Sequence, residues 1–100
     1  MNLDALVDSV TRDSEPPGTL TPALQAMWLA KKGCWDAAHD LCQDVPGTAG
    51  SWIHAWLHRQ EGDYGNACYW YSRAGKSAPT ADASLDVEWR EIAEALLAGA

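Results

Sequence analysis

One short pattern occurs twice in this chain and constrains its fold more than any other feature. A glycine, an aromatic ring and an alanine follow at the same spacing in Gly33-x-Trp35-x-x-Ala38 and, 29 residues later, in Gly62-x-Tyr64-x-x-Ala67. The glycine lets the chain reverse between helices, the ring closes the open end of a hairpin, and the alanine lets two helices approach closely. The repeat therefore predicts two helical hairpins and points to architecture rather than to catalysis.

Helix start and stop signals place the elements around this repeat. Thr21-Pro22 is a typical helix start, and Lys31-Lys32-Gly33 is a typical helix end. The remaining signals predict helices over about residues 35–44, 48–60 and 64–74, and apolar stripes predict a short first helix and a final one. No segment shows the alternating pattern of a half-buried strand. We therefore predict an all-α fold, a compact bundle of five to six helices.

The chain is expected to form one domain over residues 1–100. Its 100 residues and 47% hydrophobic content are ordinary for a single buried core. With six Trp, three Tyr and no Phe, a few large rings should set the packing. The expected parts are an N-terminal helix and proline-rich linker (1–20), two helical hairpins (21–76) and a capping helix (80–98).

Charge and cysteine content exclude several classes of function. Fourteen acidic against seven basic residues give a net charge of -7, and the cations are scattered, so we expect no nucleic acid partner. The first residues lack a secretory signal and no apolar stretch approaches the ~20 residues that span a bilayer, so we expect no membrane partner and a cytoplasmic location. Three cysteines without a Cys-x-x-Cys spacing are expected to be reduced.

Two segments of the second hairpin carry a family resemblance. The series Gly62-x-Tyr64-x-x-Ala67, followed by Tyr71, Ala74 and Pro79, resembles the second half of a tetratricopeptide repeat, and residues 69–74 are similar to a segment of Sel1-like repeats. The spacing of 29 residues is shorter than the usual one of about 34, so the resemblance is to the architecture. It implies tetratricopeptide-like hairpins that grip a peptide or a partner helix in a groove.

A longer stretch, from about Trp28 to Gly75, resembles a family of small uncharacterised microbial proteins. The shared phrases are Gly33-x-Trp35-Asp36-x-Ala38-His39 and Trp52-Ile53-His54-Ala55-Trp56-Leu57-His58-Arg59-x-Glu61-Gly62-Asp63. This resemblance implies a fold and no particular activity.

The helix expected over 48–60 carries the first candidate site. His54, His58 and Glu61 stand at i, i+4 and i+7, within about 60° of arc on one face. Two histidines four residues apart can chelate a metal, and a carboxylate one turn later can complete the set or act as a base. His39, on the neighbouring hairpin, could approach them. The alternative is an ordinary solvent-exposed polar face, with His39 a hydrogen-bonded histidine at the edge of the core, and we predict no metal or other cofactor.

The next helix carries the second candidate site. Asn66, Tyr69 and Arg73 share a face at i, i+3 and i+7, a row that could hydrogen-bond a small anionic or amide ligand. The alternative is a solvated row. The candidate ligand-binding residues are therefore His54, His58, Glu61, Asn66, Tyr69, Arg73 and His39.

These observations support two hypotheses about function. The first is a tetratricopeptide-like binding or scaffolding module for a peptide or protein partner. The alternative is a small-molecule-binding protein or small enzyme with a His/Glu/Asn/Tyr pocket. A homodimer formed through exposed apolar residues of the terminal helices is also possible. The sequence leaves open whether any reaction is catalysed.

Overall fold

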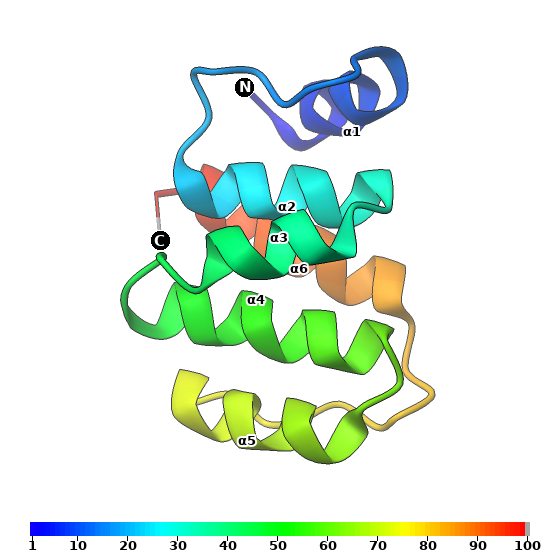
Figure 1. Ribbon diagram of the computed structural model, residues 1–100, viewed down its shortest axis with the longest axis vertical. Coiled ribbons are helices and arrows are strands. Elements are labelled where there is room, and N and C mark those ends of the chain that lie inside the picture. The colour runs from blue at the N-terminus through cyan, green and yellow to red at the C-terminus, as the bar shows by residue number, and fades with distance from the viewer. Residues whose placement is uncertain (100) are drawn as a thin grey trace.

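The computed structural model describes residues 1–99 and is all-helical over that range, as predicted (Figure 1). No strand occurs among these residues. The six helices are α1 (Leu3–Arg12), α2 (Pro22–Lys32), α3 (Trp35–Cys42), α4 (Gly47–Gln60), α5 (Tyr64–Ala74) and α6 (Leu85–Leu97).

The helix ends follow from local chemistry that the sequence displays. The Thr21 hydroxyl accepts a hydrogen bond from the backbone N–H of Leu24, which satisfies one of the free donors at the start of α2. At the other end of α2, Gly33 adopts a left-handed backbone with φ of 92°, and Gly75 does the same after α5 with φ of 69°. Residues with a Cβ are strained in that region, so glycine ends both helices.

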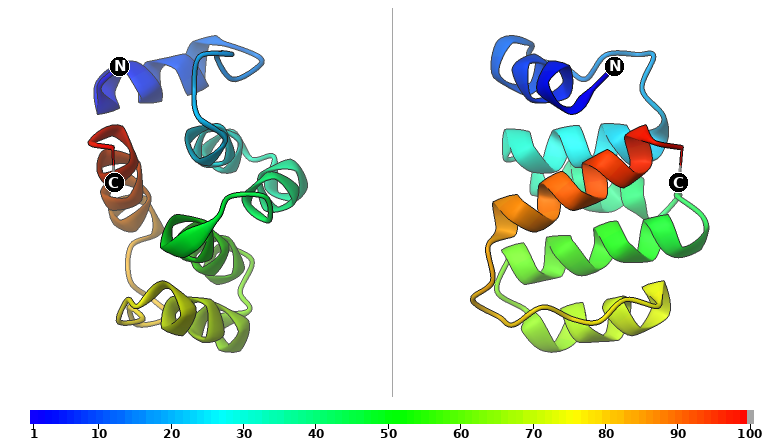
Figure 2. Two further views of the ribbon diagram at one scale, coloured as in Figure 1. Left: turned by 90° about the vertical axis from the view of Figure 1, so that its left-hand side faces the viewer. Right: turned by 180° about the vertical axis from the view of Figure 1, so that it is seen from behind.

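Two central helices organise the bundle. α2 and α4 lie side by side, with α3 against both of them on one side and α6 against both on the opposite side (Figure 2). α1 packs beyond α2 and also contacts α6, while α5 packs beyond α4 at the other end (Figure 1). The hairpins α2–α3 and α4–α5 are therefore joined through the α2–α4 contact and closed by α6.

Tryptophan rings fill the core, and their indole N–H groups donate hydrogen bonds that link neighbouring helices. Trp28 and Trp89 are fully buried. The Trp28 indole donates to the Ser9 hydroxyl at 3.1 Å, and the Trp89 indole donates to the Met27 carbonyl at 2.9 Å. Each ring thus buries a large apolar area and fixes the position of a neighbouring helix by one directional bond.

A buried ion pair attaches α6 to the second hairpin. Arg59 of α4 donates to Glu88 of α6 at 2.9 Å, and the Tyr71 hydroxyl of α5 donates to the same carboxylate at 2.6 Å. Arg59 also donates to the carbonyl of Ala83 at 2.6 Å, just before α6 begins. The Arg59 side chain therefore links α4 to α5 and to α6 and the segment before it.

α6 also covers a surface formed by the two central helices, α2 and α4. The face that α2 and α4 share opposite α3 is packed against Trp89, Ile92 and Ala93 of α6, all buried. None of the helices within residues 1–99 is long and apolar enough to cross a membrane.

Candidate functional site

The histidine face of α4 lies inside the protein. His54 and His58 are each only 7% exposed, because this face of α4 packs between α3 and α5. The alternative of a solvent-exposed face is therefore wrong for His54 and His58, whereas Glu61 on the same face is exposed. The opposite face of α4 carries Trp56 and Arg59 toward α6, so both sides of the helix are buried.

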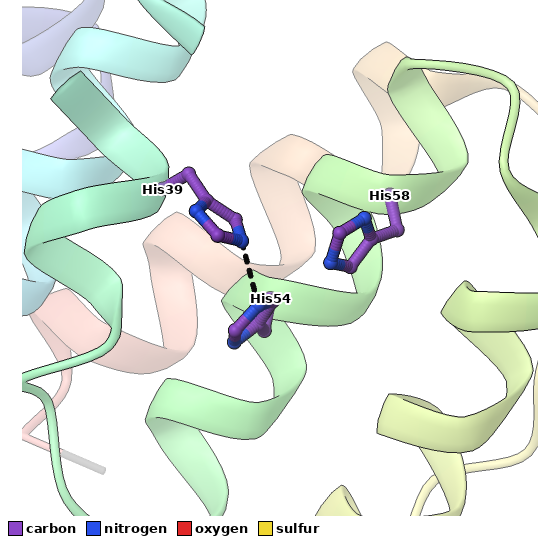
Figure 3. A group of neighbouring side chains, drawn as sticks. All are labelled: His39, His54 and His58. Atoms are coloured by element: carbon purple, nitrogen blue, oxygen red, sulfur yellow. Dashed lines mark hydrogen bonds between the residues drawn. The ribbon is translucent and has the colours of Figure 1, made fainter. Parts of the chain in front are cut away.

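All three histidines of the chain meet at one place, which we call the histidine site: His39 from α3 and His54 and His58 from α4 (Figure 3). The Nε2 atoms of His39 and His54 are 2.9 Å apart and share a hydrogen bond. The rings of His54 and His58 stack with centroids 4.9 Å apart, and those of His39 and His58 meet edge-on at 5.3 Å. His39 therefore approaches the α4 pair, and it is at the same time a hydrogen-bonded, partly exposed histidine.

Two polar side chains orient His58. Its Nδ1 donates to a Glu61 carboxylate oxygen at 2.6 Å, a short bond of the charge-assisted kind. A carboxylate can only accept, so the Nδ1 of His58 carries a proton. Nε2 of the same ring lies 3.5 Å from the Asn66 amide nitrogen of α5. Glu61 and Asn66 therefore both belong to the site.

Two tryptophans that were not among the candidate residues hold the imidazole rings in place. Trp35 stacks on His39 with centroids 4.8 Å apart, and Trp70 stacks on His54 at 3.9 Å with the planes 7° apart. The Trp35 indole N–H is itself fixed by the Leu57 carbonyl at 2.8 Å. Two features of the sequence could have identified these tryptophans: Trp35 and His39 stand at i and i+4, and Trp70 lies between Tyr69 and Tyr71.

The row on α5 divides between the site and solvent. Asn66 faces His58, whereas Tyr69 is 54% exposed and its hydroxyl accepts a hydrogen bond from Arg73 at 3.1 Å. The Arg73 guanidinium lies 5.4 Å from the centroid of the Trp70 ring. Arg73, Trp70 and His54 therefore form a continuous line from the surface to the histidine site.

A pocket of about 400 Å³ lies beside this line, between the start of α4, the end of α3 and α5. Arg73 is the charged residue in its wall, which also contains the polar groups of Ser51 and Gln43 and the rings of His54 and Trp70. The pocket volume lies in the range of small-molecule sites, which are ~300–1,000 Å³. The wall therefore combines one cation, two neutral hydrogen-bonding groups and an aromatic surface.

The surroundings of His54 suppress its protonation. Burial, together with the neighbouring His39 and His58, lowers the pKa of His54 to about 4. A neutral imidazole keeps a lone pair for a ligand. Burial raises the pKa of the nearby Cys42 thiol to about 12, so this cysteine behaves as a packed residue rather than a nucleophile.

Two groups of side chains at this location have the composition and spacing of metal sites. One nitrogen from each of His39, His54 and His58 lies within 4.8 Å of the others. A second group, His58, Glu61 and Asp63, meets the same distance limit, but its two carboxylates are exposed.

Comparisons with known protein families, with curated proteins and with solved structures find no match to this chain. The histidine site therefore has to be interpreted from its own chemistry.

Proposed function

We propose that the protein is a small-molecule-binding protein whose ligand lies in the pocket beside His54 and carries an acidic group. The proposal rests mainly on one observation: Arg73 and the buried His54 both line a pocket of about 400 Å³. Because Arg73 is the charged group among the described residues of that wall, an anion is favoured over a cation. The Trp70 ring also lines the pocket and offers apolar contact to the rest of the ligand.

The net charge of -7 strengthens the argument for a defined pocket. A chain of this charge repels anions over most of its surface, so an acidic ligand needs a local cation to bind at all. Arg73 is held over the Trp70 ring and by the Tyr69 hydroxyl, which positions its guanidinium at the pocket.

The test uses small carboxylates as probes. Acetate, succinate and citrate at about 10 mM, above the millimolar dissociation constants of weak ligands, should shift the NMR signals of the Trp70 indole N–H and of the Ser51 amide. Arg73→Gln should abolish these shifts. Arg12→Gln, which removes an exposed arginine on α1, is the matched control and should leave them unchanged. Equal responses in the two variants, or no shift with any probe, would refute the proposal.

The helical-hairpin architecture supports a second candidate, a binding module for a peptide or protein partner. Since α6 covers the shared face of α2 and α4, the partner would lie in a pocket of about 350 Å³ between α4 and α6, where Val87 is exposed. Val87→Glu should abolish co-purification of a partner without changing the folded state, and unchanged capture would refute this candidate.

A further inference from the structure

We propose that His39, His54 and His58 together bind one divalent transition-metal ion of the zinc class. The inference deepens the proposed function, because the ion would lie at the wall of the same pocket, where His54 is shared. Three observations carry it: the spacing of the nitrogens, the orientation of the rings and the rigidity of their surroundings.

The spacing of the nitrogens is close to that of ligands on one ion. Zinc binds histidine nitrogens at about 2.0–2.1 Å, which places two nitrogens in a tetrahedral site about 3.3 Å apart. In the protein the Nε2 atoms of His39 and His54 are 2.9 Å apart, and the three candidate nitrogens all lie within 4.8 Å of one another. Small rotations of the rings would therefore bring all three nitrogens to bonding distance.

The orientation of His58 is that of a metal ligand supported by an outer carboxylate. Metal-binding histidines commonly donate their second ring N–H to a carboxylate, which fixes the tautomer and makes the other nitrogen a better ligand. Glu61 accepts this bond from Nδ1 of His58 at 2.6 Å. The other nitrogen of His58, Nε2, is 3.5 Å from the Asn66 amide nitrogen, and an ion would replace this long contact on the side of the ring facing the other two histidines (Figure 3).

The rings are also held in place before any ion arrives. Trp35 and Trp70 stack on the outer faces of His39 and His54, and the Trp35 indole is anchored to a backbone carbonyl. His54 and His58 are nearly fully buried, while His39 is partly exposed and leaves access from solvent. Because the rings are already confined, the small rotations that bring the three nitrogens to an ion cost little conformational entropy.

The donor set selects the class of ion. Imidazole suits zinc, copper, nickel and iron, whereas magnesium and calcium require oxygen ligands. Glu61, the carboxylate next to the three nitrogens, accepts a hydrogen bond from Nδ1 of His58 and is therefore not counted as a ligand of the ion. Three protein ligands leave a fourth tetrahedral position for water or for a donor atom of a small ligand.

The first experiment is calorimetric titration of zinc into the full-length protein after treatment with a chelator, together with X-ray absorption of the zinc-loaded wild type. We expect one ion per chain and three imidazoles at about 2.0 Å from it. Absence of zinc binding, or a spectrum with one imidazole or none, would overturn the inference. The absorption spectrum needs no variant, so it remains decisive even if a substitution prevents folding.

Variants then assign the ligands. His39→Gln and His58→Gln should each lower the zinc affinity by more than about 100-fold, beyond the roughly 10- to 100-fold expected for the outer-shell change Glu61→Gln. Asp63→Asn is the matched control and should leave the affinity unchanged, since Asp63 belongs to the exposed alternative group. A large loss in Asp63→Asn with none in His39→Gln would place the ion on that group and refute the three-histidine site.

The two proposals fail in different ways. If zinc does not bind while carboxylates still shift the Trp70 signal through Arg73, the metal inference is refuted and small-molecule binding stands. If zinc binds as expected and no carboxylate shifts that signal, the metal site stands alone and the anionic ligand is refuted.

Discussion

Removing Arg59 should destabilise the protein more than any other single loss of a polar side chain. Arg59 is 5% exposed and Glu88 8%. Arg59→Met would leave the Glu88 carboxylate buried with two neutral donors, the Tyr71 hydroxyl and the Trp52 indole N–H. Breaking a buried ion pair by removing one partner costs about 3–5 kcal/mol, which is a large part of the ~5–15 kcal/mol that stabilises a typical domain.

A double-mutant cycle separates the ion pair from simple loss of volume. The variant with both Arg59→Met and Glu88→Leu buries no unpaired charge. The decrease in its free energy of unfolding should therefore be smaller, by at least about 2 kcal/mol, than the sum of the decreases measured for the two single variants. Urea denaturation followed by tryptophan fluorescence and by circular dichroism measures these differences. A loss below about 1 kcal/mol for Arg59→Met would be that of a surface pair and would refute the reasoning.

Three further predictions concern packing, reactivity and pH. Ala67 is fully buried between α4 and α5, so Ala67→Leu should lower the free energy of unfolding by about 1–3 kcal/mol through overpacking, and unchanged urea melting would contradict the observed helix contact. Exposed Cys34 should react with iodoacetamide at pH 8 while Cys42 does not, as peptide mapping would reveal. The pKa of His54 falls from 6.5 to about 4 on folding, so the unfolded chain binds the proton first as the pH is lowered. In the metal-free protein the contribution of neutral His54 to the free energy of unfolding should therefore be fully present above pH 6.5 and should be lost between pH 6.5 and 4. His54→Gln should weaken that decline in urea melts with a chelator, and a gain in stability toward pH 5 would contradict the assignment.

The ends of the helices were predictable because their causes are local. Thr21 caps α2 through a bond three residues away, and the glycines after α2 and α5 supply the left-handed turn that each reversal requires. Such signals involve neighbours in the chain, so the sequence displays both partners. The all-α class follows from them together with the helical apolar stripes.

The burial of the histidines could not be predicted by the same means. The i, i+4, i+7 row of His54, His58 and Glu61 is compatible with a solvated face and with a buried one, because helical periodicity specifies which residues share a face and not what packs against it. The contact with His39 depends on how α3 crosses α4, and the pairing of Arg59 with Glu88 depends on where α6 lies. Both are tertiary contacts between segments that are distant in the sequence.

The position of α6 determines when this chain can finish folding in a cell. α6 packs on both central helices and touches α1, so a helix that is synthesised after α1–α5 completes the contacts of helices made earlier. During translation the two hairpins can form early, because their contacts are local, but the apolar face shared by α2 and α4 stays open until α6 has left the ribosome. A nascent chain of this protein therefore presents an uncovered hydrophobic surface to chaperones until α6 emerges, and ribosomes stalled before residue 85 should carry it in that state.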